Sequence, residues 1–110
     1  MYEAKERLAG GLMANCEETA KLLRTLAHPQ RLQILCHLSQ KKMTVSELEG
    51  LCEASQSAIS QFLSRMKAES LVASERTGQF VVYRIADPRV LKLIQALHKI
   101  FCPSNKRGKL

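Results

Sequence analysis

Two neighbouring stretches, Thr44-Val-Ser-Glu-Leu48 and Ser55-Gln-Ser-Ala-Ile-Ser-Gln-Phe-Leu63, decide how this sequence folds. In the first, Glu47 follows Thr44 by three residues, which is the capping-box signature of a helix start. In the second, Ser55 is a suitable N-cap, and apolar residues then recur at the spacing of one helix face. The pattern predicts two short helices, the second with the apolar positions Ile59, Phe62, Leu63 and Met66.

The connection between these helices is short, and the second helix has a polar outer face. Glu53-Ala54 joins them tightly, and two short helices joined in this way are typical of a helix-turn-helix. The outer face carries hydroxyl, amide and guanidinium groups and no acid: Ser57, Ser60, Gln61, Ser64 and Arg65.

The hydrophobic period changes after the second helix. Residues 71–76 and 80–85 are short runs with β-strand character, and they flank Thr77-Gly78-Gln79. Gly78 can supply the positive φ that a tight hairpin turn requires. The sequence therefore predicts a β-hairpin directly after the helix-turn-helix, which makes the motif winged.

Helical patterns flank this motif on both sides. Upstream, apolar residues recur from Leu12 to Leu26 on one helix face, and Pro29 is well placed as the first residue of the next helix. Downstream, Asp87 is an N-cap, and Pro88 stands at the first position of the last helix. The predicted fold is mainly α with a β-hairpin wing: a winged helix-turn-helix in the order α-α-α-α-β-β-α.

The length and composition fit one small domain. The chain has 110 residues, of which 45% are hydrophobic and 25% charged, as in globular proteins. We expect a single winged-helix DNA-binding domain over residues 1–110, with a core at about 12–102 and loose ends. No apolar run is long enough to span a membrane, and the first residues lack the apolar segment of a secretory signal. We therefore expect a cytoplasmic protein with no membrane partner.

The net positive charge of the chain arises in its second half. Residues 1–53 hold 7 Lys/Arg and 7 Asp/Glu, whereas residues 54–110 hold 10 Lys/Arg and 3 Asp/Glu, so the net charge of +7 lies there. This asymmetry indicates an anionic partner, either nucleic acid or a membrane surface. A well-solvated basic surface would produce the same count.

The winged motif favours double-stranded DNA as the partner. A helix fits the major groove of B-DNA, where hydroxyl and amide side chains reach base edges and phosphates. We expect the arginines to meet phosphates, and the wing to bring Arg76 and Gln79 toward them. The predicted contacts are Thr44, Ser46, Ser55, Gln56, Ser57, Ser60, Gln61, Arg65, Arg76, Gln79 and Arg84. The alternative is a helical domain with an incidental hairpin.

Two further segments, Leu26-Ala-His-Pro-Gln-Arg-Leu-Gln-Ile-Leu35 and Gly78-Gln-Phe-Val-Val-Tyr-Arg84, complete a set of motifs that resembles the ArsR/SmtB family of winged-helix repressors. The resemblance covers roughly residues 15–102, in the family's order. It implies a homodimer, paired through its first and last helices, that binds operator DNA and releases it when an inducer binds. Many members carry His where this chain has Gln61, which keeps a hydrogen-bonding side chain there.

The metal sites of this family do not match these residues. The arsenic-sensing branch has closely spaced cysteines at the start of the first motif helix, where this chain has only Cys52, at the helix end. The zinc-sensing branch has an Asp-x-His pair early in the last helix. Here Asp87 is followed by Pro88-Arg89, and the Arg89 cation would repel a metal ion. We expect no metal site and no cofactor, although a metal-responsive regulator stays an alternative.

Cys36 and Cys102 resemble the thiol pair of the persulfide-responsive, dithiol branch of the family. The resemblance implies that both thiols lie within bridging reach in one subunit and close through a disulfide or polysulfide link. The implied inducer is a reactive sulfur species or another thiol oxidant, which releases the operator. We expect Cys102 to react first, because Lys99 and Lys106 lie near it, and Cys36 to resolve the adduct.

The remaining two cysteines suggest no site, and two other functions stay open as alternatives. Cys16 and Cys52 lie on apolar helical faces and are interpreted as structural. A small thiol redox enzyme is an alternative, but the chain has no Cys-x-x-Cys, no triad-like arrangement and no Gly-rich phosphate loop, so we expect no enzyme. A constitutive DNA-binding regulator of the same fold, with inert thiols, also stays an alternative.

Overall fold

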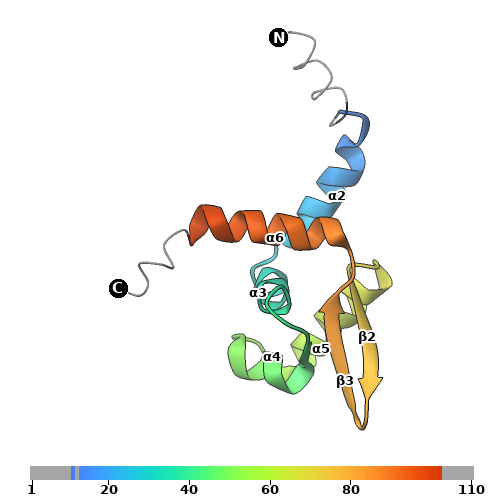
Figure 1. Cartoon of the computed structure of the whole chain (residues 1–110), viewed down its shortest axis with the longest axis vertical. Helices are drawn as coiled ribbons and strands as arrows, with labels where there is room; N and C mark the ends of the chain where they lie inside the picture. Colours follow the sequence, from blue (N-terminus) through green and yellow to red (C-terminus); the bar gives the residue numbers. More distant parts are fainter. Residues whose placement is uncertain (1–10, 12, 103–110) are drawn as a thin grey trace.

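The computed structural model describes Gly11 and residues 13–102 (Figure 1). The loose ends that we expect fall on residues 1–10 and 103–110, outside the described part. No helix in the described part is both long and apolar enough to cross a membrane.

The order of elements confirms the predicted winged helix-turn-helix. Two short helices and a hairpin form its centre, with two helices before them and one after. The elements are α2 (Cys16–Leu26), α3 (Pro29–Leu38), β1 (Met43–Thr44), α4 (Val45–Leu51), α5 (Gln56–Ala68), β2 (Val72–Thr77), β3 (Phe80–Ile85) and α6 (Pro88–Phe101).

Side-chain caps fix the starts of the helices in the motif. The Thr44 Oγ1 accepts a hydrogen bond from the Glu47 amide at 3.1 Å, and the Glu47 Oε1 accepts one from the Thr44 amide at 2.9 Å, which completes the predicted capping box. The Ser55 Oγ accepts from the Ala58 amide at 3.1 Å and caps α5. The beginnings of α4 and α5 are therefore determined by local sequence.

The start of α3 also contacts α5. The His28 Nδ1 accepts a hydrogen bond from the Gln30 amide at 3.1 Å, and Pro29 follows at the first helical position. The His28 ring packs against the Phe62 ring of α5, with ring centroids 4.9 Å apart. One histidine therefore caps one helix and packs against another.

The hairpin belongs to a three-stranded antiparallel sheet in the order β1-β3-β2. β1 has only two residues and pairs Met43 with Tyr83. The sequence did not predict this strand, because two residues show no periodicity. Thr77 pairs with Phe80 across the turn, where Gly78 has the expected positive φ of 66°. Figure 1 shows the hairpin extending at the same end of the molecule as α4 and α5, away from α2.

The core lies between α3, α4, α5 and the sheet, and α6 closes it. Ile34, Leu48 and Ile59 are fully buried, and α6 adds Val90 and Ile94. In contrast, α2 buries only its last residue. The core therefore holds α5 rigidly and leaves most of α2 uncovered in a single chain.

Candidate nucleic-acid interface and thiol pair

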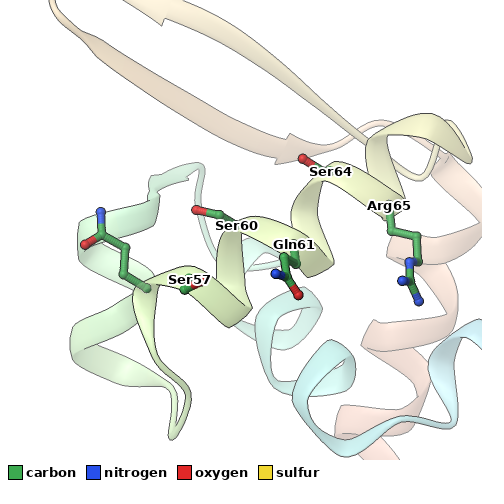
Figure 2. A pocket seen from close by; sticks show the side chains of 6 residues that line it. Ser57, Ser60, Gln61, Ser64 and Arg65 are labelled. Carbon is green, nitrogen blue, oxygen red and sulfur yellow. The ribbon is translucent and has the colours of Figure 1, made fainter.

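The outer face of α5 forms an open hollow of about 800 Å³. Figure 2 shows Ser60 and Ser64 pointing to one side of the helix axis, and Gln61 and Arg65 to the other. The predicted DNA contacts of this helix all line the hollow. Ser64 lines it as well, although it was not among the predicted contacts. Its lining residues are Gln56, Ser57, Ser60, Gln61, Ser64 and Arg65.

The opposite face of α5 explains why this surface points outward. Ile59, Leu63 and Met66 have no exposed surface, so rotating the helix would bring polar side chains into the core. The cap at Ser55 fixes the first turn, and its hydroxyl oxygen already accepts one hydrogen bond. The side chains that follow Ser55 are therefore presented by a helix of fixed orientation.

The start of α4 presents two different hydroxyl groups. The Thr44 side chain is half-buried and belongs to the capping box, whereas Ser46 is exposed. Thr44 therefore positions the helix, and Ser46 has its side chain open to solvent beside it.

The structure separates the two arginines of the hairpin. Arg76 pairs with Val81 and Arg84 with Ala73, so alternation of side chains places them on opposite faces of the hairpin. Lys67 of α5 donates a hydrogen bond to the Ser74 Oγ at 2.7 Å, and Ser74 shares its face with Arg76. Arg76 is therefore on the α5 side, near the turn, and Arg84 is on the other side, near the hairpin base.

The electrostatics of this end of the molecule suit an anion. Within the described residues, no carboxylate lies within 4.0 Å of the Arg65, Arg76 or Arg84 guanidinium groups. Glu75 of the hairpin is paired with Lys42 at 3.8 Å, an exposed contact of little energetic weight. The exposed guanidinium groups thus keep their charge available to a partner.

Cys36 and Cys102 are far apart in the sequence and lie on two different helices. Cys36 lies in α3 and Cys102 caps α6, and both are exposed free thiols. Burial, and then the negative charge of the nearby Cys102, raise the pKa of the Cys36 thiol. The charge of Cys102 therefore acts on Cys36 across the space between α3 and the end of α6.

The other two cysteines differ from each other. Cys52 is buried in the core, as its structural interpretation requires, and burial raises the pKa of its thiol. Cys16 is exposed, so the expectation that it packs inside the chain is wrong for the single chain. The reason is that α2 contacts the core near its C-terminal end, through Leu22 and Leu26, whereas Cys16 lies at its first position.

Asp87 at the start of α6 is engaged by an arginine. Its two carboxylate oxygens accept hydrogen bonds from the Arg89 Nε at 3.1 Å and Nη2 at 2.8 Å, and these bonds lower the pKa of Asp87. Arg89 also lies 3.8 Å from Glu18 of α2. Over residues 13–102 and Gly11, no three His, Cys, Asp or Glu side chains are grouped as a metal site would need.

The sequence is similar to bacterial regulatory proteins. The profile of the bacterial regulatory protein arsR family matches residues 28–74. A biofilm growth-associated repressor of Agrobacterium fabrum is 40% identical over 85 residues, which cover 77% of this chain and 73% of the repressor. The transcriptional activator HlyU of Vibrio cholerae is 36% identical over 92 residues, covering 84% of this chain and 85% of HlyU.

Solved structures show the same fold. The repressor BigR of Xylella fastidiosa superposes with a TM-score of 0.79 at 32% identity, covering 86% of this chain and 96% of BigR. The reduced form of Vibrio cholerae HlyU superposes with a TM-score of 0.77 at 35% identity, covering 84% of this chain and 97% of that structure.

Proposed function

Because the chain belongs to the arsR family of bacterial regulatory proteins, and within it resembles BigR and HlyU, we propose that it is a homodimeric transcriptional repressor. It binds operator DNA when reduced and releases it when Cys36 and Cys102 become linked. The observation that carries the DNA-binding part is the acid-free polar face of α5, held outward by a buried apolar face.

In this proposal α5 enters the major groove. The amides of Gln56 and Gln61 and the hydroxyls of the serines have the donors and acceptors that read base edges. Arg65 at the end of the helix and Arg76 on the same side of the hairpin meet phosphates, which fix the register of the helix. Arg84, on the other face, reaches a phosphate only farther along the duplex.

A second copy of the chain completes the DNA-binding unit. Apolar side chains are exposed on α6, where Phe101 is 75% and Ile100 is 64% exposed. Leu23 on α2 and Met13, just before α2, are exposed as well. Contact with the same helices of a partner buries this surface. A two-fold dimer also presents two copies of α5 to successive major grooves.

The thiol pair is the proposed switch. Burial raises the pKa of the Cys36 thiol and so disfavours its thiolate, and the proposal therefore assigns the attack to Cys102 and the resolving step to Cys36. The inducer is a reactive sulfur species. That HlyU of Vibrio cholerae has been solved in a reduced form supports thiol redox chemistry among these relatives.

The link acts through the dimer. It ties α3 to the end of α6, and α6 belongs to the proposed dimer interface, so closing the link changes the spacing of the two α5 helices. A coupling free energy of about 3 kcal/mol would weaken operator binding roughly 150-fold.

The test measures operator binding by fluorescence anisotropy before and after persulfide treatment. We expect reduced protein to bind and treated protein to release DNA, with a 36–102 link found by mass spectrometry and Cys16 and Cys52 still free. The variants Cys36→Ser and Cys102→Ser should bind DNA and not release it. If both variants still released DNA, the thiol switch would be wrong, and the protein would respond to another signal. If the reduced protein did not bind DNA, the proposed repressor function itself would be wrong.

A further inference from the structure

Two glutamines of α3 hold the turn between α4 and α5. Glu53 lies in this turn, between Cys52, which caps the end of α4, and Ser55, which caps the start of α5. The Gln30 Nε2 donates a hydrogen bond to the Glu53 carbonyl oxygen at 3.2 Å, and the Glu53 amide donates one to the Gln33 Oε1 at 3.3 Å. Both backbone polar groups of Glu53 are therefore bound to one helix, and we call Gln30 and Gln33 the glutamine clamp.

The clamp is a long-range contact. Its two bonds join residues 23 and 20 positions apart in the sequence, so they form only when α3 packs beside the turn. Gln30 and Gln33 are about one helical turn apart on the same face of α3, and both are half-buried. Two bonds to one residue fix the direction of its peptide groups as well as its position, which a single bond does not.

The helix that carries the clamp is a firm support. Ile34 and Leu35 of α3 are fully buried in the core. At the start of α3, the ring of His28 packs against Phe62 of α5. α3 is thus anchored both to the core and to α5, and the clamp ties the turn to this same helix.

The clamp lies next to the part of α5 that precedes its buried residues. Gln56 and Ser57, which the proposed function places against bases, follow Glu53 by three and four residues. The first buried residue of α5 is Ile59. The Ser55 cap fixes where the helix begins, but a cap acts only within the helix end itself. The direction of the first turn of α5 therefore depends on how the residues before it are held.

We infer that Gln30 and Gln33 are positioning residues for sequence recognition. Through Glu53 they hold the first turn of α5 at the angle at which its side chains reach base edges. The inference rests on the proposed DNA-binding function and names residues outside the DNA-binding surface that set its specificity. Recognition needs side chains held to about 0.5 Å and 10–20°. A loosened turn therefore weakens contacts to bases more than contacts to phosphates, which carry no sequence information.

The two clamp bonds have opposite polarity, which provides a matched pair of substitutions. Glutamate has the shape of glutamine but, when charged, only accepts hydrogen bonds. Gln30→Glu therefore replaces the donor with an acceptor that faces the Glu53 carbonyl oxygen, and it breaks the clamp. Gln33→Glu keeps an acceptor for the Glu53 amide. Both variants add the same negative charge to the same face of α3.

The test compares sequence preference in the reduced full-length protein. The probes are a duplex selected from a random pool by the unmodified protein and a scrambled duplex of equal length and composition, both titrated by fluorescence anisotropy. We expect Gln30→Glu to lower the ratio of the two affinities about tenfold, since a polar group is left without its partner, and Gln33→Glu to keep this ratio. Gln33→Met, which lacks the amide oxygen, should lose the preference and speed up hydrogen exchange at the Glu53 amide.

A double-mutant cycle separates positioning from general stability. Gln56→Ala should cost less sequence preference in the Gln30→Glu background than in the unmodified protein, because the contact of Gln56 is already weakened there. A general loss of stability would leave this cost unchanged. An undiminished cost would therefore overturn the clamp.

Gln40→Glu is the control: it adds the same charge at an exposed position just beyond α3 and should keep the preference. An equal loss in Gln30→Glu and Gln33→Glu, or no loss in Gln30→Glu, would overturn the clamp and leave the DNA-binding proposal intact. If the selection enriched no duplex, sequence-specific binding and this inference would both be wrong. Circular dichroism checks that each variant is folded. Gln30→Met, which lacks the donor and adds no charge, takes the place of Gln30→Glu if that variant does not fold.

Discussion

Asp87 holds two different groups at the start of α6. Its side chain accepts a hydrogen bond from the Arg89 amide at 2.9 Å as an N-cap, and it pairs with the Arg89 guanidinium. The carboxylate is largely buried, whereas Arg89 is mostly exposed. Because the pKa of Asp87 is lowered in the folded chain, the charged form stabilises the fold.

The variant Asp87→Asn tests this contribution as a function of pH. Asparagine keeps the cap and removes the charge, so we expect a loss of about 0.5–1 kcal/mol of unfolding free energy at pH 7. The loss should be constant above about pH 5 and shrink as the pH falls below about 4, through the lowered pKa, because wild-type Asp87 then becomes protonated. Urea unfolding between pH 2 and pH 7 measures it, and a pH-independent difference would contradict the ion pair.

Gly78 and Gly50 make a matched pair of glycines. A Cβ at either position meets no atom within 4 Å, but only Gly78 has a positive φ, of 66°. Gly78→Ala should therefore lower the unfolding free energy by about 1 kcal/mol through backbone strain. Gly50→Ala, in α4, should raise it by about 0.5–1 kcal/mol. Thermal denaturation of both variants gives the signs, and a loss in both would point to crowding in place of strain.

At the scale of elements, the proposed complex gives α5 and the hairpin different roles in binding DNA. We expect Gln56→Ala and Ser57→Ala to cost about 1–3 kcal/mol on the preferred operator and little on other sequences, since the proposal places these side chains against bases. Arg76→Ala should weaken binding to all sequences about equally. Anisotropy titrations with operator and scrambled duplexes measure both effects, and a sequence-selective effect of Arg76→Ala would place it on a base.

The position of Arg84 gives a second comparison on the same hairpin. Because Arg84 lies on the face away from Lys67 and α5, Arg84→Ala should weaken binding less than Arg76→Ala. The same titrations rank the two variants. A larger loss at Arg84 would mean that the duplex contacts the other face of the hairpin.

The elements themselves were largely predictable, because short-range signals specify them. The capping box at Thr44, the cap at Ser55 and the glycine turn at residue 78 each act within four residues. The features that the sequence did not predict depend on contacts between residues far apart in the chain. The β1 pairing and the opposite faces of Arg76 and Arg84 arise only when separate segments of the chain pair in the sheet.

At the scale of the whole molecule, the proposed dimer and its charge set the DNA affinity. A dimer that neutralises about 6–10 phosphates should lose about 10³–10⁵ in affinity between 50 and 200 mM salt. Phe101→Glu should disrupt the dimer, and sedimentation velocity should then show a monomer with weak DNA binding. A flat salt response, or a dimer that survives the substitution, would contradict this assembly.

One helix joins the two regions that the proposed function has to connect. His28 caps the start of α3 and packs its ring on Phe62 of α5, and α3 carries Cys36 near its other end. Its 10 residues make a stiff rod about 15 Å long. In the proposed switch, a link formed at Cys36 would therefore act on the same rigid helix whose start packs against α5. The distance between the thiol and the proposed DNA-binding helix is then bridged by a single helix within one subunit.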